Sequence, residues 1–285
     1  MTDSETILKK LDHIDDLPTL PSIVLEVDRL LQDYDTPMEK LTATIEKDQA
    51  MVPKLLKLVN SAFFGLPSKV SEISRAISLL GFNTVRNAIV SISVVEAFKT
   101  NGKSECFNIQ GFWTHSIAVA VTSKYLACNT HFKAPETAFT GGLLHDIGKI
   151  VLALYFNDIF SNVWASAEKN KMSFYDAERK EIPITHAQIG SYLAKKWHLP
   201  SDLVDIIQNH HEVTETSKVF DLLAIIHTAD VIVNSHEVDS EGKIGLSELC
   251  PDAGSPMTNQ LETAHDWFPD VSEDIQSACE FFLSG

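Results

Sequence analysis

A histidine and an aspartate in the middle of an apolar segment place the strongest constraint on how this chain can fold. His145 and Asp146 lie within residues 138–154, where apolar side chains recur on every side of the helix that the segment would form. Such a helix is largely buried, and a buried histidine or carboxylate is costly unless it is hydrogen-bonded, paired or bound to a metal. For these two residues alone, a satisfied pair in the core is the simpler interpretation. Lys149 follows Asp146 by three residues, so it can either pair with that carboxylate or meet an anion on the same face.

Apolar residues recur at helical spacing through most of the chain, and no run alternates long enough to predict a strand. We therefore predict an all-α protein. Prolines at residues 17–21 separate the first two helices, and residues 36–39 have the sequence of a capping box at the start of another. A second capping box, at residues 185–188, places His186 in the first turn of its helix.

The polar stretch at residues 99–105 is the best internal boundary. We predict an N-terminal helical subdomain at residues 1–105, a second helical subdomain at 106–236 and a C-terminal loop with helices at 237–285. In the last part, residues 237–257 have the composition of a loop, and residues 258–284 predict one or two amphipathic helices.

Polar residues in buried-looking helical surroundings form the candidate site. They are His115, His145, Asp146, His186, His210, His211 and Asp230. About one helical hairpin separates successive members, so antiparallel helices can bring them to the same depth. Imidazoles and carboxylates without thiolates suit one or two divalent ions such as Fe, Mn or Zn. Asp146 can bridge two ions, with a water activated between them for attack on a phosphoester, and Lys149 can stabilise the phosphoryl charge. Asp146 and Lys149 are thus the predicted catalytic residues.

Simpler interpretations of single members stay open. His115 and His186 lie near helix starts, where a histidine can simply be exposed. One of the adjacent His210 and His211 would face solvent by chance. Asp230 can form a buried pair with a histidine three residues earlier on the same helix face.

The charge balance and the cysteines limit the class of protein. The net charge is −16, with 39 acidic and 23 basic residues, and such a field repels phosphate backbones, so we expect no nucleic-acid partner. The four cysteines lack C-x-x-C spacing, which fits reduced thiols in the cytoplasm. No apolar run approaches the roughly 18 residues of a membrane span, and the acidic N-terminus is not typical of a signal peptide. We expect a cytoplasmic protein without membrane insertion.

A series of short motifs makes the chain resemble a known family. The motifs are Leu17-Pro18-x-Leu20-Pro21, Asp48, Asn60-Ser61-Ala62-Phe63-Phe64-Gly65, Ala76-Ile77-x-Leu79-Leu80-Gly81, Phe112-Trp113-x-His115-Ser116, Ala138-Phe139-x-Gly141-Gly142-Leu143-Leu144-His145-Asp146-Ile147-Gly148-Lys149, Thr185-His186-Ala187-x-x-Gly190, Trp197-x-Leu199-Pro200, His210-His211-Glu212 and Ala229-Asp230. They cover roughly residues 17–233 and resemble the HDOD (HD-related output domain) branch of the HD superfamily of metal-dependent phosphohydrolases. The resemblance implies a multi-helical fold, with the N-terminal helical subdomain packed on an HD-like helical bundle. It also implies a bacterial signalling module, often an output or scaffold domain.

Two functions are consistent with the residues and the resemblance. The first is a regulatory or output module with a His/Asp metal site that interacts with other signalling proteins or a small phosphorylated ligand. The alternative is an active dinuclear metal-dependent phosphohydrolase that acts on a nucleotide or another phosphoester. The complete ligand series favours the enzyme. The sibling branch that hydrolyses cyclic di-GMP carries a Gly-Tyr-Pro signature after its His-His-Glu, whereas here Glu212 is followed by Val213 and Thr214, which argues against that substrate and favours the module.

Overall fold

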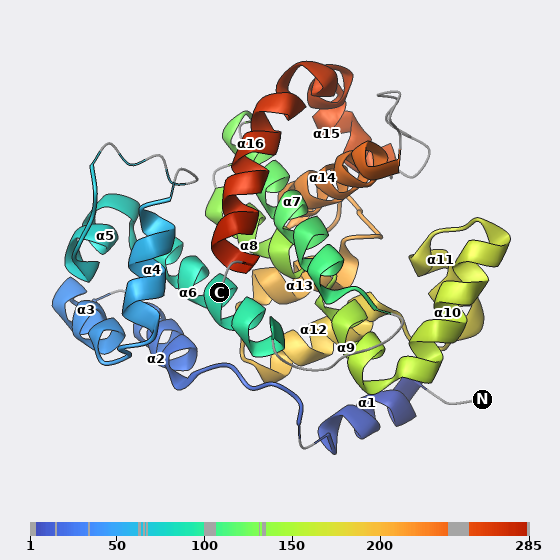
Figure 1. Cartoon of the computed structure of the whole chain (residues 1–285), viewed down its shortest axis with the longest axis horizontal. Coiled ribbons are helices and arrows are strands. Elements are labelled where there is room, and N and C mark those ends of the chain that lie inside the picture. The colour runs from blue at the N-terminus through green and yellow to red at the C-terminus, as the bar shows by residue number, and fades with distance from the viewer. Residues whose placement is uncertain are drawn as a thin grey trace.

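The computed structural model describes residues 4–14, 16–33, 35–61, 64, 66, 68–99, 107–130, 132, 135–238 and 251–283. Every regular element within these residues is a helix, which confirms the predicted all-α class. The helices are α1 (Ser4–Asp12), α2 (Ser22–Leu31), α3 (Met38–Glu46), α4 (Met51–Val59), α5 (Ile73–Leu80), α6 (Phe82–Lys99), α7 (Ile109–Cys128), α8 (Pro135–Leu144), α9 (Ile147–Tyr155), α10 (Asn157–Asn170), α11 (Phe174–Glu181), α12 (His186–Lys196), α13 (Ser201–Asn209), α14 (Phe220–Val238), α15 (Pro251–Glu262) and α16 (Ala264–Leu283). In Figure 1, α2 to α5 form one end of the molecule, and α6 leads from them into the larger part.

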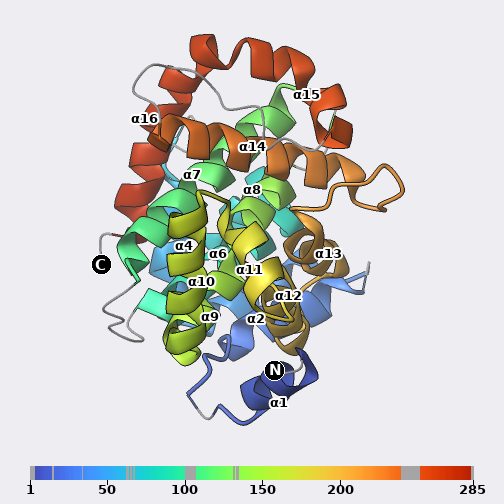
Figure 2. The same ribbon diagram turned by 90° about the vertical axis from the view of Figure 1, so that its right-hand side faces the viewer.

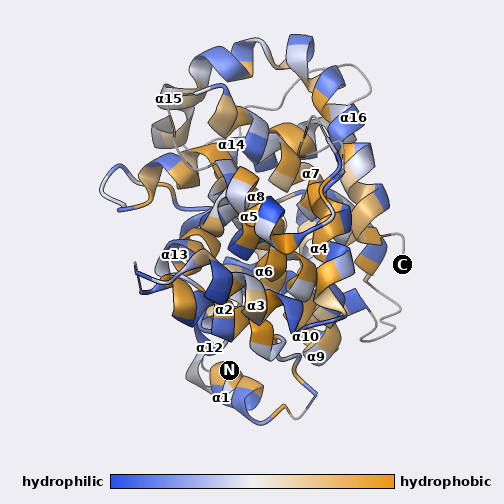
Figure 3. Cartoon of the chain, turned by 90° about the vertical axis from the view of Figure 1, so that its left-hand side faces the viewer, coloured by the Kyte–Doolittle hydropathy of each residue, from blue (hydrophilic) through white to orange (hydrophobic). Residues whose placement is uncertain are grey.

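The smaller end consists of short amphipathic helices packed against α6. Their buried side chains recur at helical spacing, as Leu55, Leu58 and Val59 do in α4, and Figure 3 shows hydrophobic and hydrophilic colour on different sides of these outer helices. Gly81 ends α5 with a φ of 82°, a left-handed conformation that glycine adopts without strain. The chain turns there by 117° into α6, which is buried along most of its length.

One of the two predicted capping boxes is present. At α12, the Thr185 hydroxyl accepts from the amide of Gln188, whose side chain accepts in return from the Thr185 amide. At α3, Pro37 precedes the first helical residue and no side chain caps it. The hydroxyl of Thr36 donates instead to the carbonyl of Leu30, at 2.7 Å. The predicted capping box at the start of α3 is therefore wrong, because this threonine holds the turn after α2.

The larger part is built around α8 and α9, which pack among α7, α12, α13 and α14. Residues Pro135–Tyr155 are long and apolar enough to span a membrane, but 83% of that window is buried inside the protein, as in a core helix. The continuous helix predicted here is wrong: α8 ends before His145, and His145 and Asp146 form a turn before α9. The carbonyl of Gly142, in the last turn of α8, accepts a hydrogen bond from His145 Nδ1 at 2.6 Å.

Both ends of the chain pack against this larger part. Trp197 Nε1 donates to the carbonyl of Pro18 at 2.9 Å, and the Tyr155 hydroxyl donates to the carbonyl of Asp16 at 2.8 Å, so the segment after α1 lies against α9 and the end of α12. Helix α16 packs along α7, and Phe282 near its end stacks on a phenylalanine of α8. The predicted division into three subdomains stays a prediction.

The C-terminal part contains more helix than the sequence indicates. Helix α14 continues to Val238, and α15 begins at Pro251. The loop predicted at residues 237–257 is therefore wrong over 251–257, since proline is well tolerated in the first turn of a helix, where its missing amide has no partner to lose. Residues 239–250, and all of the polar stretch at 99–105 except Lys99, lie outside the described residues.

Candidate metal centre

The fold gathers all of the predicted site residues in one place. His115 lies on α7, His145 and Asp146 form the turn between α8 and α9, and Asp230 lies on α14. His186 is the first residue of α12, and two further histidines, His210 and His211, follow the end of α13. Two groups of side chains have ligand atoms that all lie within 4.8 Å of one another: Asp146 with His186, His210 and His211, and Asp146 with His115 and His145.

Glycines allow the helices of the centre to approach this closely. A side-chain methyl group built at Gly148 of α9 would overlap the backbone carbonyl of His186, and one at Gly190 of α12 would crowd the backbone of Gly148. Gly142 of α8 faces the backbone of α7 in the same way. The crossing of α9 over α12 is the contact that brings His186 to Asp146.

The two carboxylate oxygens of Asp146 face different histidines. Oδ1 lies 3.0 Å from Nε2 of His186 and 3.6 Å from Nε2 of His210. Oδ2 lies 3.4 Å from Nε2 of His145 and 3.9 Å from Nε2 of His115. Asp146 therefore stands between two clusters of imidazole nitrogens.

The histidines direct their Nε2 atoms to the centre because their Nδ1 atoms are used elsewhere. Nδ1 of His145 donates to the carbonyl of Gly142 and Nδ1 of His210 to that of Ile207, at 2.6 and 2.9 Å. A donating Nδ1 leaves an electron pair on Nε2, as a metal ligand requires. Nε2 of His186 lies 3.3 Å from that of His210 and 3.1 Å from that of His211, so these nitrogens converge.

Glu178, on α11, supports the centre and was not among the predicted residues. Its side chain is fully buried, and its two oxygens accept from Nδ1 and from the backbone amide of His186, at 2.6 and 2.8 Å. The available sequence signal is its position four residues after Phe174, on the same helix face. A carboxylate behind a ligating histidine fixes the ring orientation and makes the ligand more basic.

Asp230 pairs with histidines of the centre. Its Oδ1 lies 3.1 Å from Nε2 of His115 and 3.7 Å from Nε2 of His145. His227, the alternative partner that the sequence left open, donates from Nδ1 to the carbonyl of His210 at 2.8 Å. His115 lies in the second turn of α7 with its side chain 15% exposed, and His186 is completely buried, so neither is an exposed residue at a helix start.

Charge in the centre shifts the pKa of several groups in opposite directions. Burial lowers the pKa of His145, but the carboxylates of Asp146 and Asp230 outweigh it and raise this pKa to about 10. Burial raises the pKa of Asp146, but His145 and Lys149 hold it well below its usual value. Burial dominates at His210 and lowers its pKa to about 4. Cationic and neutral imidazoles thus lie side by side, and a metal ion would compete for the same electron pairs as the protons.

Lys149 faces the centre and lines a cavity. Its Nζ lies 2.5 Å from Oδ2 of Asp146, and burial lowers its pKa less than the carboxylates of Asp146 and Asp230 raise it. The cavity has a volume of about 420 Å³, and His115, Asp146 and Lys149 line it together with several aromatic residues. Figure 2 looks onto α10 and α11, the pair of helices that supplies some of the aromatic residues lining this cavity.

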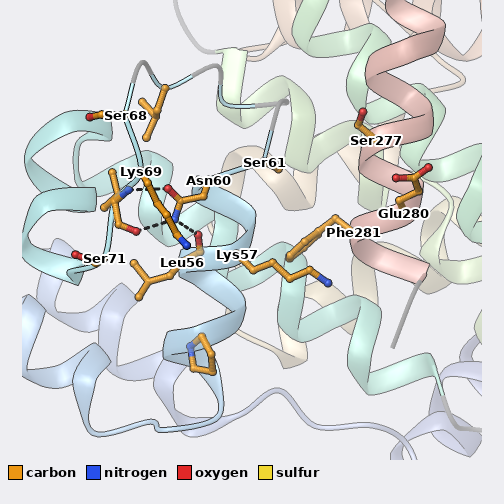
Figure 4. A pocket seen from close by; sticks show the side chains of 13 residues that line it. Leu56, Lys57, Asn60, Ser61, Ser68, Lys69, Ser71, Ser277, Glu280 and Phe281 are labelled. Carbon is orange, nitrogen blue, oxygen red and sulfur yellow. Dashed lines mark hydrogen bonds between the residues drawn. The ribbon is translucent and has the colours of Figure 1, made fainter.

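A larger groove, of about 1090 Å³, lies between α4 and α16 and contains none of the predicted site residues. Figure 4 shows Asn60 on one wall and Phe281 on the other. The Asn60 amide donates to the carbonyls of Leu56 and Val70, and its oxygen accepts from the Val70 amide. Asn60 is therefore a structural connection between α4 and the following segment.

The residues of the centre fit a bound divalent metal. Nε2 of His145 and Oδ1 of Asp146 are buried, and neither makes a hydrogen bond of good geometry among the described residues. Other ligand atoms of the centre lie close to both: Nε2 of His186 is 3.0 Å from Oδ1 of Asp146, and Oδ2 of Asp146 is 3.4 Å from Nε2 of His145. Buried polar atoms without a well-formed hydrogen bond are uncommon and need an explanation. The donor set of imidazole nitrogens and carboxylate oxygens suits divalent transition metals. These buried His/Asp groups are thus able to bind metal ions.

The described residues thus form an all-helical protein with a buried His/Asp cluster at its centre. The HDOD domain model matches residues 17–213. The chain belongs to the HDOD family, as the motifs predicted.

Two proteins of known sequence show how far the similarity extends. The chain is 28% identical over 203 residues to an uncharacterized protein of Treponema pallidum, a match that covers 71% of this chain and 39% of that protein. It is 27% identical over 169 residues to Ribonuclease Y of Mycoplasma mycoides, covering 59% of this chain and 33% of that protein. The chain thus spans well under half the length of these relatives.

Two crystal structures resemble the fold over nearly the whole chain. An HDOD domain protein of unknown function from Geobacter sulfurreducens superimposes with a TM-score of 0.79 at 27% identity, over 99% of this chain and 100% of that one. A candidate phosphohydrolase from Shewanella amazonensis gives a TM-score of 0.72 at 23% identity, over 95% and 96% of the two chains. The second similarity concerns the fold alone.

Proposed function

We propose that the centre binds two divalent transition-metal ions and hydrolyses a phosphoester bond in a small phosphorylated ligand, within a cytoplasmic signalling protein. The observation that carries this proposal is the position of Asp146, whose two oxygens face two separate histidine groups while the same residue lines a cavity. A structural metal site is closed by protein ligands, whereas a catalytic one keeps access for substrate.

The members of the two ligand groups each have a part in this proposal, and Asp230, which belongs to neither group, pairs with His115 and His145. His186, His210 and His211 would hold one ion, His115 and His145 the other, and Asp146 would bridge them. When bound, such ions supply Lewis acidity toward water and toward phosphoryl oxygens.

Lys149 supplies a fixed positive charge in the lining of the cavity, where a phosphate oxygen can accept from its ammonium group. The neighbouring carboxylates keep it protonated, since they raise its pKa.

Metal content and hydrolysis together test the proposal. Protein purified without oxygen should contain about two equivalents of metal by mass spectrometry and should release phosphate or a nucleotide from one member of a phosphoester panel. The panel should include an RNA oligonucleotide, since Ribonuclease Y by its name acts on RNA, whereas the charge of −16 predicts that nucleic acid is not the ligand. Asp146→Ala should lose metal and turnover, and Asp274→Ala, at an exposed position of α16, should lose neither. Absence of metal in the native protein would refute the proposal.

A regulatory module is the second candidate, and the segment after the His210-His211 pair favours it. Glu212 accepts from the Tyr175 hydroxyl at 2.9 Å and is followed by Val213 and Thr214 in place of a Gly-Tyr-Pro signature. In this case the protein would contain metal and bind a phosphorylated ligand or a signalling partner without turnover. The same experiment separates the two, because both require metal and only the first releases product.

A further inference from the structure

The cavity beside the metal centre has one wall made of aromatic side chains. These lining residues are Phe107, Phe112, Phe160, Trp164 and Phe174. Phe160 and Trp164 are stacked, with ring centroids 6.0 Å apart and planes inclined by 23°. Phe160 and Phe174 have their ring centroids 5.3 Å apart. The rings come from α7, the segment before it, α10 and α11, and together they form an apolar lining that no local sequence pattern indicates.

Trp164 is the exposed member of this wall. Its side chain is 49% accessible, whereas Phe160 behind it is 1% accessible. An indole ring held by stacking at the mouth of a cavity presents a large flat surface to whatever enters. Within the part of the chain that the structure describes, the other exposed large apolar residues are Leu25 and Leu79, and they do not line this cavity.

Polar and charged side chains line the same cavity. Lys149 Nζ lies 5.7 Å from the ring centroid of Phe174, so the cation and the aromatic wall belong to one space. Asp146 and His115 of the proposed centre line the cavity as well. A ligand that fills the cavity must therefore combine a planar apolar part with an anionic part.

We propose that this cavity binds a mononucleotide, with the base stacked on Trp164 and the phosphate directed to Lys149 and the metal centre. The inference rests on the proposed function for its phosphate end, whereas the aromatic wall supports it independently. Stacking of a base on an aromatic side chain contributes substantially to nucleotide binding and accepts every base. A volume of about 420 Å³ lies toward the small end of ligand cavities and suits one nucleotide unit better than two.

Binding of guanosine 5′-monophosphate and of ribose 5-phosphate to the full-length protein tests the proposal. Both compounds carry the same phosphate, and only the first has a base. Isothermal titration should show that the nucleotide binds at least about tenfold more tightly. Trp164→Ala should reduce this preference for the nucleotide by about tenfold, and Trp164→Phe should largely restore it, since phenylalanine still offers a ring face. Leu79→Ala, which removes an equally exposed apolar side chain outside the cavity, should leave the preference unchanged.

Tryptophan fluorescence gives a second readout that does not depend on turnover. The nucleotide should change the emission of the native protein, and this change should disappear in Trp164→Phe while the affinity is kept. Equal binding of the two compounds, or a Trp164→Ala protein with an unchanged preference, would overturn the inference. Metal content measured on the same samples keeps the proposals apart: two equivalents of metal without a base preference would contradict the mononucleotide alone, and no metal would contradict the proposed function.

Discussion

Replacement of Glu178 by glutamine tests how the centre is held together. In the native protein, the two carboxylate oxygens of Glu178 accept from Nδ1 and from the backbone amide of His186, at 2.6 and 2.8 Å. Glutamine has almost the same shape, but it has one oxygen to accept with and an NH₂ group that can only donate. In Glu178→Gln, one of the two N–H groups of His186 must therefore face another donor.

The size of the effect follows from the burial of this contact. A buried donor without an acceptor costs about 1–3 kcal/mol, so the free energy of unfolding should fall by that amount. Loss of the partner behind a ligating histidine typically weakens metal binding about 10- to 100-fold, which corresponds to about 1.4–2.8 kcal/mol. The His186 ring would lose both its fixed orientation and the carboxylate that makes Nε2 a better ligand.

Competition with a chelator of known affinity measures the metal affinity, and thermal unfolding measures the stability. Glu181→Gln is the matched control, because Glu181 lies on the same helix and its side chain is exposed, with a hydrogen bond from the Ser166 hydroxyl. This variant should keep native metal affinity. If Glu178→Gln bound metal as tightly as the control, Glu178 would not position His186, and the reasoning would be wrong.

Further variants and the pH dependence test other parts of the centre. In Gly148→Ala the free energy of unfolding should fall by about 1–3 kcal/mol, and most of the metal should be lost, because the new methyl group overlaps a carbonyl of α12. Gly81→Ala, which is strained only by its φ of 82°, should also unfold more easily, but it should keep its metal. Asp146→Ala should remove both ions by mass spectrometry; retention of one would show that the carboxylate is not shared. The thermal stability of the metal-free protein should be highest near pH 6.5. It should fall toward pH 4, because His210, with its pKa lowered to about 4, takes up a proton on unfolding. It should also fall toward pH 10, because His145, with its pKa raised to about 10, releases one. Stability that rose steadily with pH over this range would contradict these shifts.

The ligand series could be predicted because its residues are conspicuous in their surroundings. Asp230 lies in a nearly uniform apolar helix, and His145 and Asp146 interrupt another, so each requires a polar partner. Helical spacing of apolar residues likewise predicted the all-α class, since long periodic segments leave little choice of structure. What periodicity missed was the turn at His145, because apolar residues on both sides of it continue the helical pattern.

The residues around the ligands could not be predicted from local sequence. Glu178 lies in a polar helix, and it is buried only because α11 packs over the start of α12, a tertiary contact. The aromatic wall combines Phe107 and Phe112 with Trp164 and Phe174, which are far apart in the chain. At α3, a threonine with the right spacing for a cap bonds instead to a carbonyl of the preceding helix.

The position of Asp146 between two histidine groups has a consequence for how metal ions would load. Both ions would draw on the single negative charge of one carboxylate, so the first to bind leaves less charge to attract the second. The second ion should therefore bind more weakly than the first, so that the two ions bind in separate steps of unequal affinity. This weakening is reciprocal, because each ion would reduce the affinity for the other by the same factor. Over a range of metal concentrations the half-loaded form would predominate, and the state of the centre would then report the supply of free metal around the protein.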